Sequence, residues 1–268
     1  MRETGRIMVL MYHIIAAEVT RPEWTRTPAD FRDDIALLKS EGYYPINLRD
    51  LAHGRVDVPA GRSPVVLTFD DSTPGQYRLL SDGSLDPECA VGIMQTAVAE
   101  GDWASRATFF TLLDTEASER VVFGQPEKKS EKLRNLVDWG YEVGSHTISH
   151  LRLNEITAEE ARRQLALSKV MLEEMIGGGY EVESLAPPYG AYPESDSVFT
   201  GTYQGVAYDY RAVVEVGDGP CPSPFSPDFR PSHIPRVKVN GTALRELVEY
   251  FKRHPEMRLW AGRTGHRS

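Results

Sequence analysis

The chain has 268 residues, of which 41% are hydrophobic and 26% charged, with a formal net charge of -9 and a pI near 5.3. These values are typical of a soluble globular protein, and the length fits a single domain. The negative charge argues against nucleic acid and anionic lipid as partners, because both attract basic surfaces, so a neutral or cationic ligand is expected.

Neither a membrane span nor a leader is predicted. No stretch approaches the roughly 18 apolar residues that a span needs, and the apolar part of the first residues is too short for a signal peptide. Cys89 and Cys221 are the only cysteines. They are too few for a disulfide scaffold or a thiolate zinc cluster, although one bridge between them stays open.

Short β-rich runs recur along the chain. The first, at residues 7–12, is continuous and apolar, which predicts a strand covered on both faces, with His13 at its end. Further strands are predicted at residues 43–48, 65–69, 108–113, 141–143 and 183–185.

Helical patterns lie between several of these strands. One helix is predicted between Thr27, a typical N-cap residue, and Gly42. A second begins with a capping box formed by Thr157 and Glu160, and a last one follows Gly241. Strands and helices that alternate along the whole length favour an α/β fold with a largely parallel sheet, open or closed into a barrel.

Two stretches interrupt this alternation, at residues 72–106 and 217–236. The second contains so many prolines that an ordered loop is expected there, not a helix or a central strand. Both stretches are candidates for the rim of a site. Tyr77 and Trp103 in the first are candidates to shape a sugar-binding groove, although aromatic residues more often belong to the core.

Two features of the sequence carry chemistry. Asp70 and Asp71 end the strand predicted at 65–69, and adjacent half-buried carboxylates require a cation or a proton near them. His146 and His150 follow another predicted strand, and their spacing brings both to one point if the backbone makes a helical turn. Two histidines and one carboxylate can hold Zn²⁺, Co²⁺, Ni²⁺ or Fe²⁺ and leave positions open for water.

Each feature alone has a commoner explanation. An Asp-Asp pair is usually a solvated turn or a helix cap, and most histidine pairs at this spacing bind no metal. A zinc-peptidase site is disfavoured because Thr147 stands where that signature requires a glutamate. The two features together, at the ends of different strands, favour a metal site in which the second aspartate serves as the base.

Three motifs, "LTFDDS" at 67–72, "GSHTISH" at 144–150 and "LAPPYG" at 185–190, resemble those of the polysaccharide deacetylase or NodB-homology family, carbohydrate esterase family 4. The opening "VLMYHII" is similar to the branch that includes poly-N-acetylglucosamine deacetylases. The resemblance covers nearly the whole chain. It implies one domain over residues 1–268, a distorted (β/α) barrel of about seven strands, with insertions at 72–106 and 217–236.

The resemblance implies an enzyme that removes acetate from N-acetylglucosamine units of a bacterial surface or cell-wall polysaccharide. Asp71, His146 and His150 correspond to the metal ligands, and Zn²⁺ is the expected ion. Asp70 corresponds to the base that takes a proton from water. The backbone N–H of Tyr189 resembles the donor that holds the oxyanion.

His13 corresponds to the general acid that protonates the leaving amine, a task suited to an imidazole pKa near 6.5. Without the resemblance, a hydrogen-bonded histidine at a strand end would be preferred. His233 is a second candidate acid or a rim residue, and Pro188 is expected at the substrate rim. Ala186 stands where many family members have an arginine that pairs with the base, so a higher pKa is expected for Asp70.

Three functions therefore stay open: a metal-dependent deacetylase, a non-catalytic carbohydrate-binding barrel, and a metal amidohydrolase that acts on a cyclic amide. The expected partner is an N-acetylated glycan. An extracellular or cell-surface location is what the resemblance implies.

Overall fold

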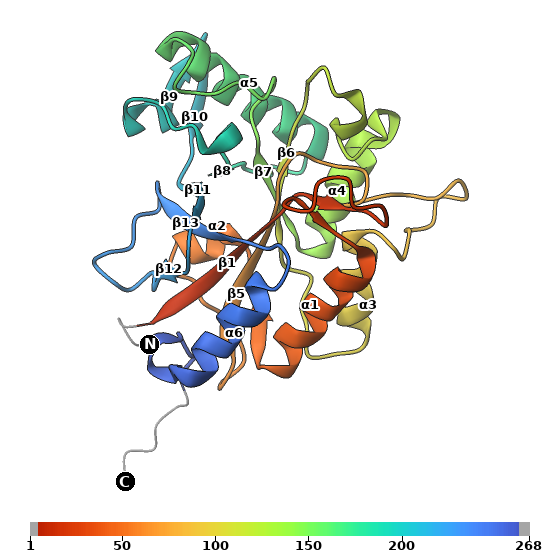
Figure 1. Ribbon diagram of the computed structural model, residues 1–268. Helices are drawn as coiled ribbons and strands as arrows, with labels where there is room; N and C mark the ends of the chain where they lie inside the picture. Colours follow the sequence, from red (N-terminus) through yellow and green to blue (C-terminus); the bar gives the residue numbers. More distant parts are fainter. Residues whose placement is uncertain (1–4, 263–268) are drawn as a thin grey trace.

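The computed structural model describes residues 5–262, and Figure 1 shows their arrangement. Within these residues seven strands pair in parallel and close into a ring, as the predicted barrel requires. In ring order they are β1 (Arg6–Tyr12), β5 (Ser63–Phe69), β6 (Thr108–Thr111), β7 (Glu142–Ser145), β8 (Ser184–Leu185), β11 (Ala212–Asp218) and β13 (Ile234–Lys238).

Shorter strands lie at the margins of the ring. They are β4 (Tyr43–Pro45), parallel to β5; β12 (Cys221–Pro222), antiparallel to β1; and two small sheets, β2 (Ile14–Ile15) with β3 (Thr25–Arg26) and β9 (Thr200–Tyr203) with β10 (Val206–Asp209). Cys89 and Cys221 are both buried and free, so the bridge that the sequence left open is not formed.

Helices cover the outside of the strands (Figure 1). The α-helices are α1 (Pro28–Ser40), α2 (Leu48–Ala52), α3 (Ala90–Ala99), α4 (Lys129–Trp139), α5 (Ala158–Ile176) and α6 (Ala243–Arg253). Short 3₁₀ turns are η1 (Ser118–Arg120), η2 (Pro126–Lys128), η3 (Pro188–Gly190), η4 (Asp196–Phe199) and η5 (Pro255–Met257). No helix among residues 5–262 is both long and apolar enough to cross a membrane.

The predicted helix starts are confirmed, with one difference in detail. Thr27 caps α1 through a complete capping box with Asp30. At α5 the Thr157 hydroxyl accepts from the Glu160 N–H, but the Glu160 carboxylate accepts from the side chain of Gln164 instead of returning to the cap. The second box is therefore only half formed.

The predicted strands are confirmed with shifted ends. The run predicted at 43–48 ends at Pro45, because α2 already begins at Leu48. The expectation that residues 217–236 hold no central strand is wrong, since β13 begins at Ile234 and closes the ring. Pro235 is tolerated there because the pairing of β11 with β13 shifts register at this point and needs no donor from every residue.

The stretch at 72–106 is also more regular than expected, because it contains α3. Tyr77 and Trp103 in this stretch are buried in the main core, with 0% and 4% of their surface exposed. Neither aromatic ring therefore shapes a groove, and both residues belong to the hydrophobic core.

A buried ion pair joins two strands across the interior of the ring. Arg236 of β13 is fully buried and donates to both oxygens of Asp70, at 2.7 and 2.8 Å, directly after β5. It also donates to Thr68 Oγ1 at 3.1 Å and to the carbonyl of Glu215 at 2.7 Å. This arginine therefore ties β13 to its neighbour β11 and, across β1, to β5.

We expect Arg236→Met to lower the free energy of unfolding by about 3–5 kcal/mol, because it leaves the Asp70 carboxylate buried without a partner. Urea denaturation of metal-free protein measures this. Asp70→Asn combined with Arg236→Met should be more stable than Arg236→Met alone, because the unpaired charge is gone. If the double variant instead lost as much unfolding free energy as Arg236→Met and Asp70→Asn lose together when made singly, the coupling would be contradicted.

A second buried cation lies in α4. The Lys132 ammonium is fully buried and donates to the carbonyls of Tyr77 at 2.8 Å and Phe123 at 3.3 Å. Burial lowers the pKa of Lys132 to about 8, which nearby acidic groups only partly offset. The folded state therefore releases this proton at a lower pH than the unfolded chain, in which the pKa is about 10.4.

Between these two pH values the unfolded state binds more protons, so the stability contributed at this site rises with pH. Relative to Lys132→Met, the wild-type protein should gain up to about 3 kcal/mol of unfolding free energy between about pH 7.5 and 10. Urea denaturation across this range measures the difference. The exposed Lys129 of the same helix provides the matched control Lys129→Met. The difference in unfolding free energy between this variant and the wild-type protein should stay constant across the pH range.

Candidate metal centre and active site

A cavity of about 560 Å³ opens where the strands of the ring end. Its lining brings together most of the residues that the sequence singled out, and these follow four different strands. They are His13 after β1, Asp70 and Asp71 after β5, His146 and His150 after β7, and Tyr189 after β8. The parallel ring delivers these side chains to one end, as expected for a barrel of this kind.

Asp71, His146 and His150 converge on one point. Oδ1 of Asp71 lies 3.3 Å from Nε2 of His146 and 3.2 Å from Nε2 of His150, and the two Nε2 atoms are 3.2 Å apart. A tetrahedral zinc ion with bonds of about 2.0–2.1 Å separates its ligand atoms by about 3.3 Å. The triangle of these three atoms therefore fits such an ion, with a fourth position left for water or substrate.

The tautomer of His146 supports the same assignment. Its Nδ1 lies 2.7 Å from the carbonyl oxygen of Ala186, which can only accept a hydrogen bond. Nδ1 of the neutral ring therefore carries the proton, and the lone pair of Nε2 points toward Asp71 and His150. This is the state that a metal-binding histidine requires.

The backbone between the two histidines is not a helical turn, contrary to the expectation from their spacing. Thr147 and His150 have left-handed φ angles of 67° and 56°. The N–H groups of Ile148 and Ser149 donate to the buried side chain of Gln164 in α5, at 3.1 and 3.0 Å. A loop braced by a helix therefore brings the imidazoles together.

Asp71 is charged and held from two sides. Burial alone would raise the pKa of this carboxyl group, but the hydrogen bonds that His146 and His150 donate when their rings are protonated hold it well below its usual range. Its second oxygen accepts from Nη1 of Arg120 in η1, at 3.1 Å. The pKa of His150 is lowered mainly by burial, whereas the hydrogen bond to Asp71 raises that of His146 despite burial.

Asp70 lines the same cavity and pairs with Arg236. Burial would raise its pKa, but the paired guanidinium of Arg236 holds it below the usual range. The expectation of a raised pKa, drawn from Ala186, is therefore wrong. Arg236 of β13, which is distant in sequence, pairs with Asp70 in place of the arginine that many family members carry at the position of Ala186.

His13 lies beside Asp70, with Nε2 3.7 Å from Oδ2. Gln76 donates to the backbone carbonyls of both residues, at 2.6 and 2.5 Å, and so fixes their separation. The His13 ring packs against Trp24 with centroids 4.5 Å apart. Burial lowers the pKa of His13 to about 4, so the expected value near 6.5 does not hold in this cavity.

Two predicted rim residues lie elsewhere. Pro188 is buried and is absent from the lining of this cavity. His233 lies between two carboxylates, with Nδ1 2.9 Å from Glu215 and Nε2 3.0 Å from Asp196, and stacks on Tyr192. The structure therefore places His13, and not His233, beside Asp70.

Several residues in or next to the cavity were not found from the sequence. Arg236 and Arg120 each bind one of the two aspartates, and Arg21, Trp24 and Arg152 complete the rim. Only Arg236 lay in a stretch already singled out, residues 217–236. The others occupy loops whose local pattern carries no signal.

A second cavity, of about 860 Å³, adjoins the first and shares Arg120, His150 and Tyr189 with it. Its lining also contains three acidic residues, Asp114, Glu116 and Glu119. Together the two cavities offer an open surface longer than the metal centre itself, which suits an extended ligand.

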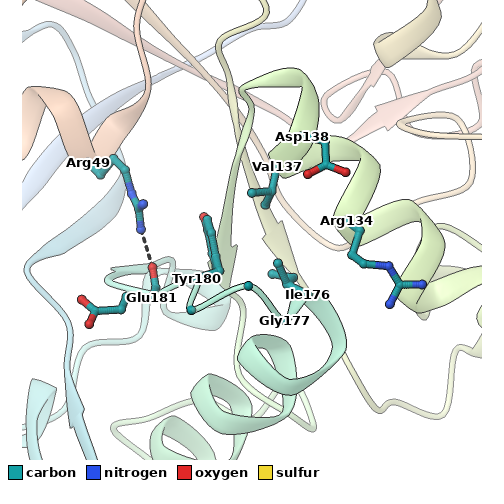
Figure 2. A pocket seen from close by; sticks show the side chains of 10 residues that line it. Arg49, Arg134, Val137, Asp138, Ile176, Gly177, Tyr180 and Glu181 are labelled. Carbon is teal, nitrogen blue, oxygen red and sulfur yellow. Dashed lines mark hydrogen bonds between the residues drawn. The ribbon is translucent and has the colours of Figure 1, made fainter.

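A third cavity, of about 630 Å³, is lined by residues that precede the barrel strands in the chain, so it lies near the amino ends of the strands (Figure 2). Arg49 donates there to the carbonyl of Glu181, and its guanidinium lies 4.9 Å from the ring centroid of Tyr180. Among the described residues, the one group with metal-ligand geometry is that of Asp71, His146 and His150. The chemistry therefore belongs at the opposite end of the barrel.

Comparison with known proteins identifies the family. The family described as polysaccharide deacetylase matches residues 57–198. A curated relative, the peptidoglycan-N-acetylglucosamine deacetylase of Bacillus cereus, is 26% identical over 137 residues, which are 51% of this chain. The match spans only 40% of that relative's length.

Solved structures share the fold. The Streptococcus pyogenes deacetylase PplD, in complex with acetate, is 21% identical, with a TM-score of 0.66 over 92% of this chain and 98% of its own. IcaB from Ammonifex degensii is 18% identical, with a TM-score of 0.64 over 92% and 97% of the two chains. Since the family match extends over more than half of the sequence, the chain belongs to the polysaccharide deacetylase family.

Proposed function

We propose that this protein is a metal-dependent N-deacetylase that hydrolyses the N-acetyl group of N-acetylglucosamine units in a bacterial surface or cell-wall polysaccharide and releases acetate. The observation that carries the proposal is the triangle of Asp71, His146 and His150, with the ionised Asp70 beside it. A binding module has no need of a base next to a metal centre, so this arrangement favours the catalyst over a non-catalytic barrel.

The metal ligands set where the acetyl group must lie. A divalent ion held by Asp71, His146 and His150, with Zn²⁺ as the expected ion, would polarise the acetyl carbonyl and lower the pKa of a coordinated water. The backbone N–H of Tyr189 is the proposed second donor to the developing oxyanion. This role depends on the left-handed backbone at Tyr189, with φ of 60°, which turns the peptide out of the regular helical geometry.

Asp70 and His13 handle the proton. Asp70 stays ionised through Arg236 and accepts the proton that the attacking water loses. When the carbonyl carbon–nitrogen bond breaks, the leaving amine needs one proton. His13, with Nε2 3.7 Å from Asp70, is the proposed group that takes the proton from Asp70 and gives it to the leaving amine. Because the pKa of His13 is about 4, the imidazole is neutral near pH 7 and relays this proton instead of holding one in advance.

The substrate class follows from the shape of the site and the family. The cavity that adjoins the metal centre provides room for sugar units beside the reacting one. The curated relative acts on peptidoglycan N-acetylglucosamine by its name. The motif "VLMYHII" supports poly-N-acetylglucosamine as the alternative polymer. Either substrate is consistent with an extracellular or cell-surface location.

Asp70→Asn should lower acetate release by about 10²–10⁴-fold, because the base is lost while the carboxamide keeps its shape. Release is measured from chitooligosaccharide, poly-N-acetylglucosamine and peptidoglycan, with zinc added or with a chelator. The wild-type protein should lose activity with the chelator and regain it with zinc. Metal-independent release, or no release from any N-acetylated sugar, would contradict the proposal, and turnover of a cyclic amide alone would favour the amidohydrolase.

His13→Gln should lower kcat by about 10²-fold or more with little change in KM, because proton transfer is impaired and not binding. His233→Gln is the matched control, since that histidine lies between two carboxylates outside the cavity. It should keep activity within about 3-fold of wild type. The reverse pattern would assign the acid role to His233.

A further inference from the structure

The short segment 186–189 contacts the outer nitrogen of both metal-centre histidines. Nδ1 of His146 lies 2.7 Å from the Ala186 carbonyl, and Nδ1 of His150 lies 3.1 Å from the Tyr189 hydroxyl. The first contact uses the backbone and would survive any side chain. The second depends on the tyrosine itself.

The Tyr189 side chain is held in place although 56% of the residue is exposed. Its ring centroid lies 4.6 Å from that of His150, and the guanidinium carbon of Arg152 lies 4.2 Å from the ring centroid. A cation over an aromatic face is attracted by the ring quadrupole. The ring is therefore fixed between an imidazole and a guanidinium, and it does not swing free in solvent.

The hydroxyl contact decides which nitrogen of His150 faces the centre. A histidine that binds metal through Nε2 carries its proton on Nδ1 and donates it to an outer acceptor. For His150 the outer acceptor is the Tyr189 oxygen. The backbone at His150 is left-handed and its ring is only partly buried, so the fold constrains this imidazole less than that of His146.

We propose that the Tyr189 side chain is a positioning residue: its hydroxyl accepts from Nδ1 of His150 and holds Nε2 of that ring toward the metal. The inference rests on the proposed metal-dependent function. It assigns to Tyr189 a task separate from that of its backbone N–H. One residue then links the orientation of a metal ligand to the donor that faces the oxyanion.

Tyr189→Phe tests this directly, because it removes the hydroxyl and keeps the ring and the backbone. We expect the dissociation constant for Zn²⁺, measured on metal-free protein by competition with a chromophoric chelator, to rise about 10–100-fold. The absorption bands of the Co²⁺-loaded protein should shift as well, because the ligand field changes. The unfolding free energy of the metal-free protein should stay within about 0.5 kcal/mol of wild type, because the residue is exposed.

Tyr192→Phe is the matched control. The Tyr192 hydroxyl is buried and has no hydrogen-bond partner among the described groups, so its removal should leave zinc affinity unchanged. Arg152→Met should weaken zinc binding by less than Tyr189→Phe, because it loosens the ring without removing the acceptor.

An unchanged zinc affinity and cobalt spectrum in Tyr189→Phe would overturn the inference, whatever the activity. A wild-type protein that binds zinc but releases no acetate would instead refute the proposed function alone. In that case weakened zinc binding by Tyr189→Phe would still support the positioning role, so the two failures are distinguishable.

Discussion

The ion pair between Arg236 and Asp70 is the contact on which both the barrel and the proposed chemistry depend. A carboxylate buried at the end of β5 is costly unless a cation accompanies it. Arg236 supplies that cation from β13, and in doing so it spans β1 and joins strands far apart in sequence. The contact that keeps the proposed base ionised therefore also ties together the strands that close the ring.

The two adjacent aspartates have different tasks because the backbone turns between them. Asp70 directly follows β5 and pairs with Arg236, whereas Asp71 has a φ of 74° and contacts the histidines and Arg120. A left-handed aspartate is strained, and such strain is retained where the surrounding structure fixes it. Each carboxylate thus has its own cation, and the like charges do not compete for one partner.

The metal centre is held by an outer layer of contacts as much as by its ligands. Gln164 braces the loop between the histidines, and Ala186, Tyr189 and Arg120 each contact the outer side of one ligand. Outer contacts of this kind orient ligands and raise metal affinity. The helices and loops around the barrel therefore supply the precision that short strands such as β7 and β8 cannot supply alone.

The sequence by itself determined the alternating α/β pattern, the cap at Thr27 and the set of residues expected to meet a metal, because apolar runs, capping residues and motifs are local signals. Tertiary structure decided which cation accompanies Asp70, that Pro235 lies in a barrel strand, and that His150 reaches the centre without a helical turn. These outcomes depend on ring closure and strand register, which bring residues from distant strands to one point. A local sequence pattern contains no information on which distant residues will meet.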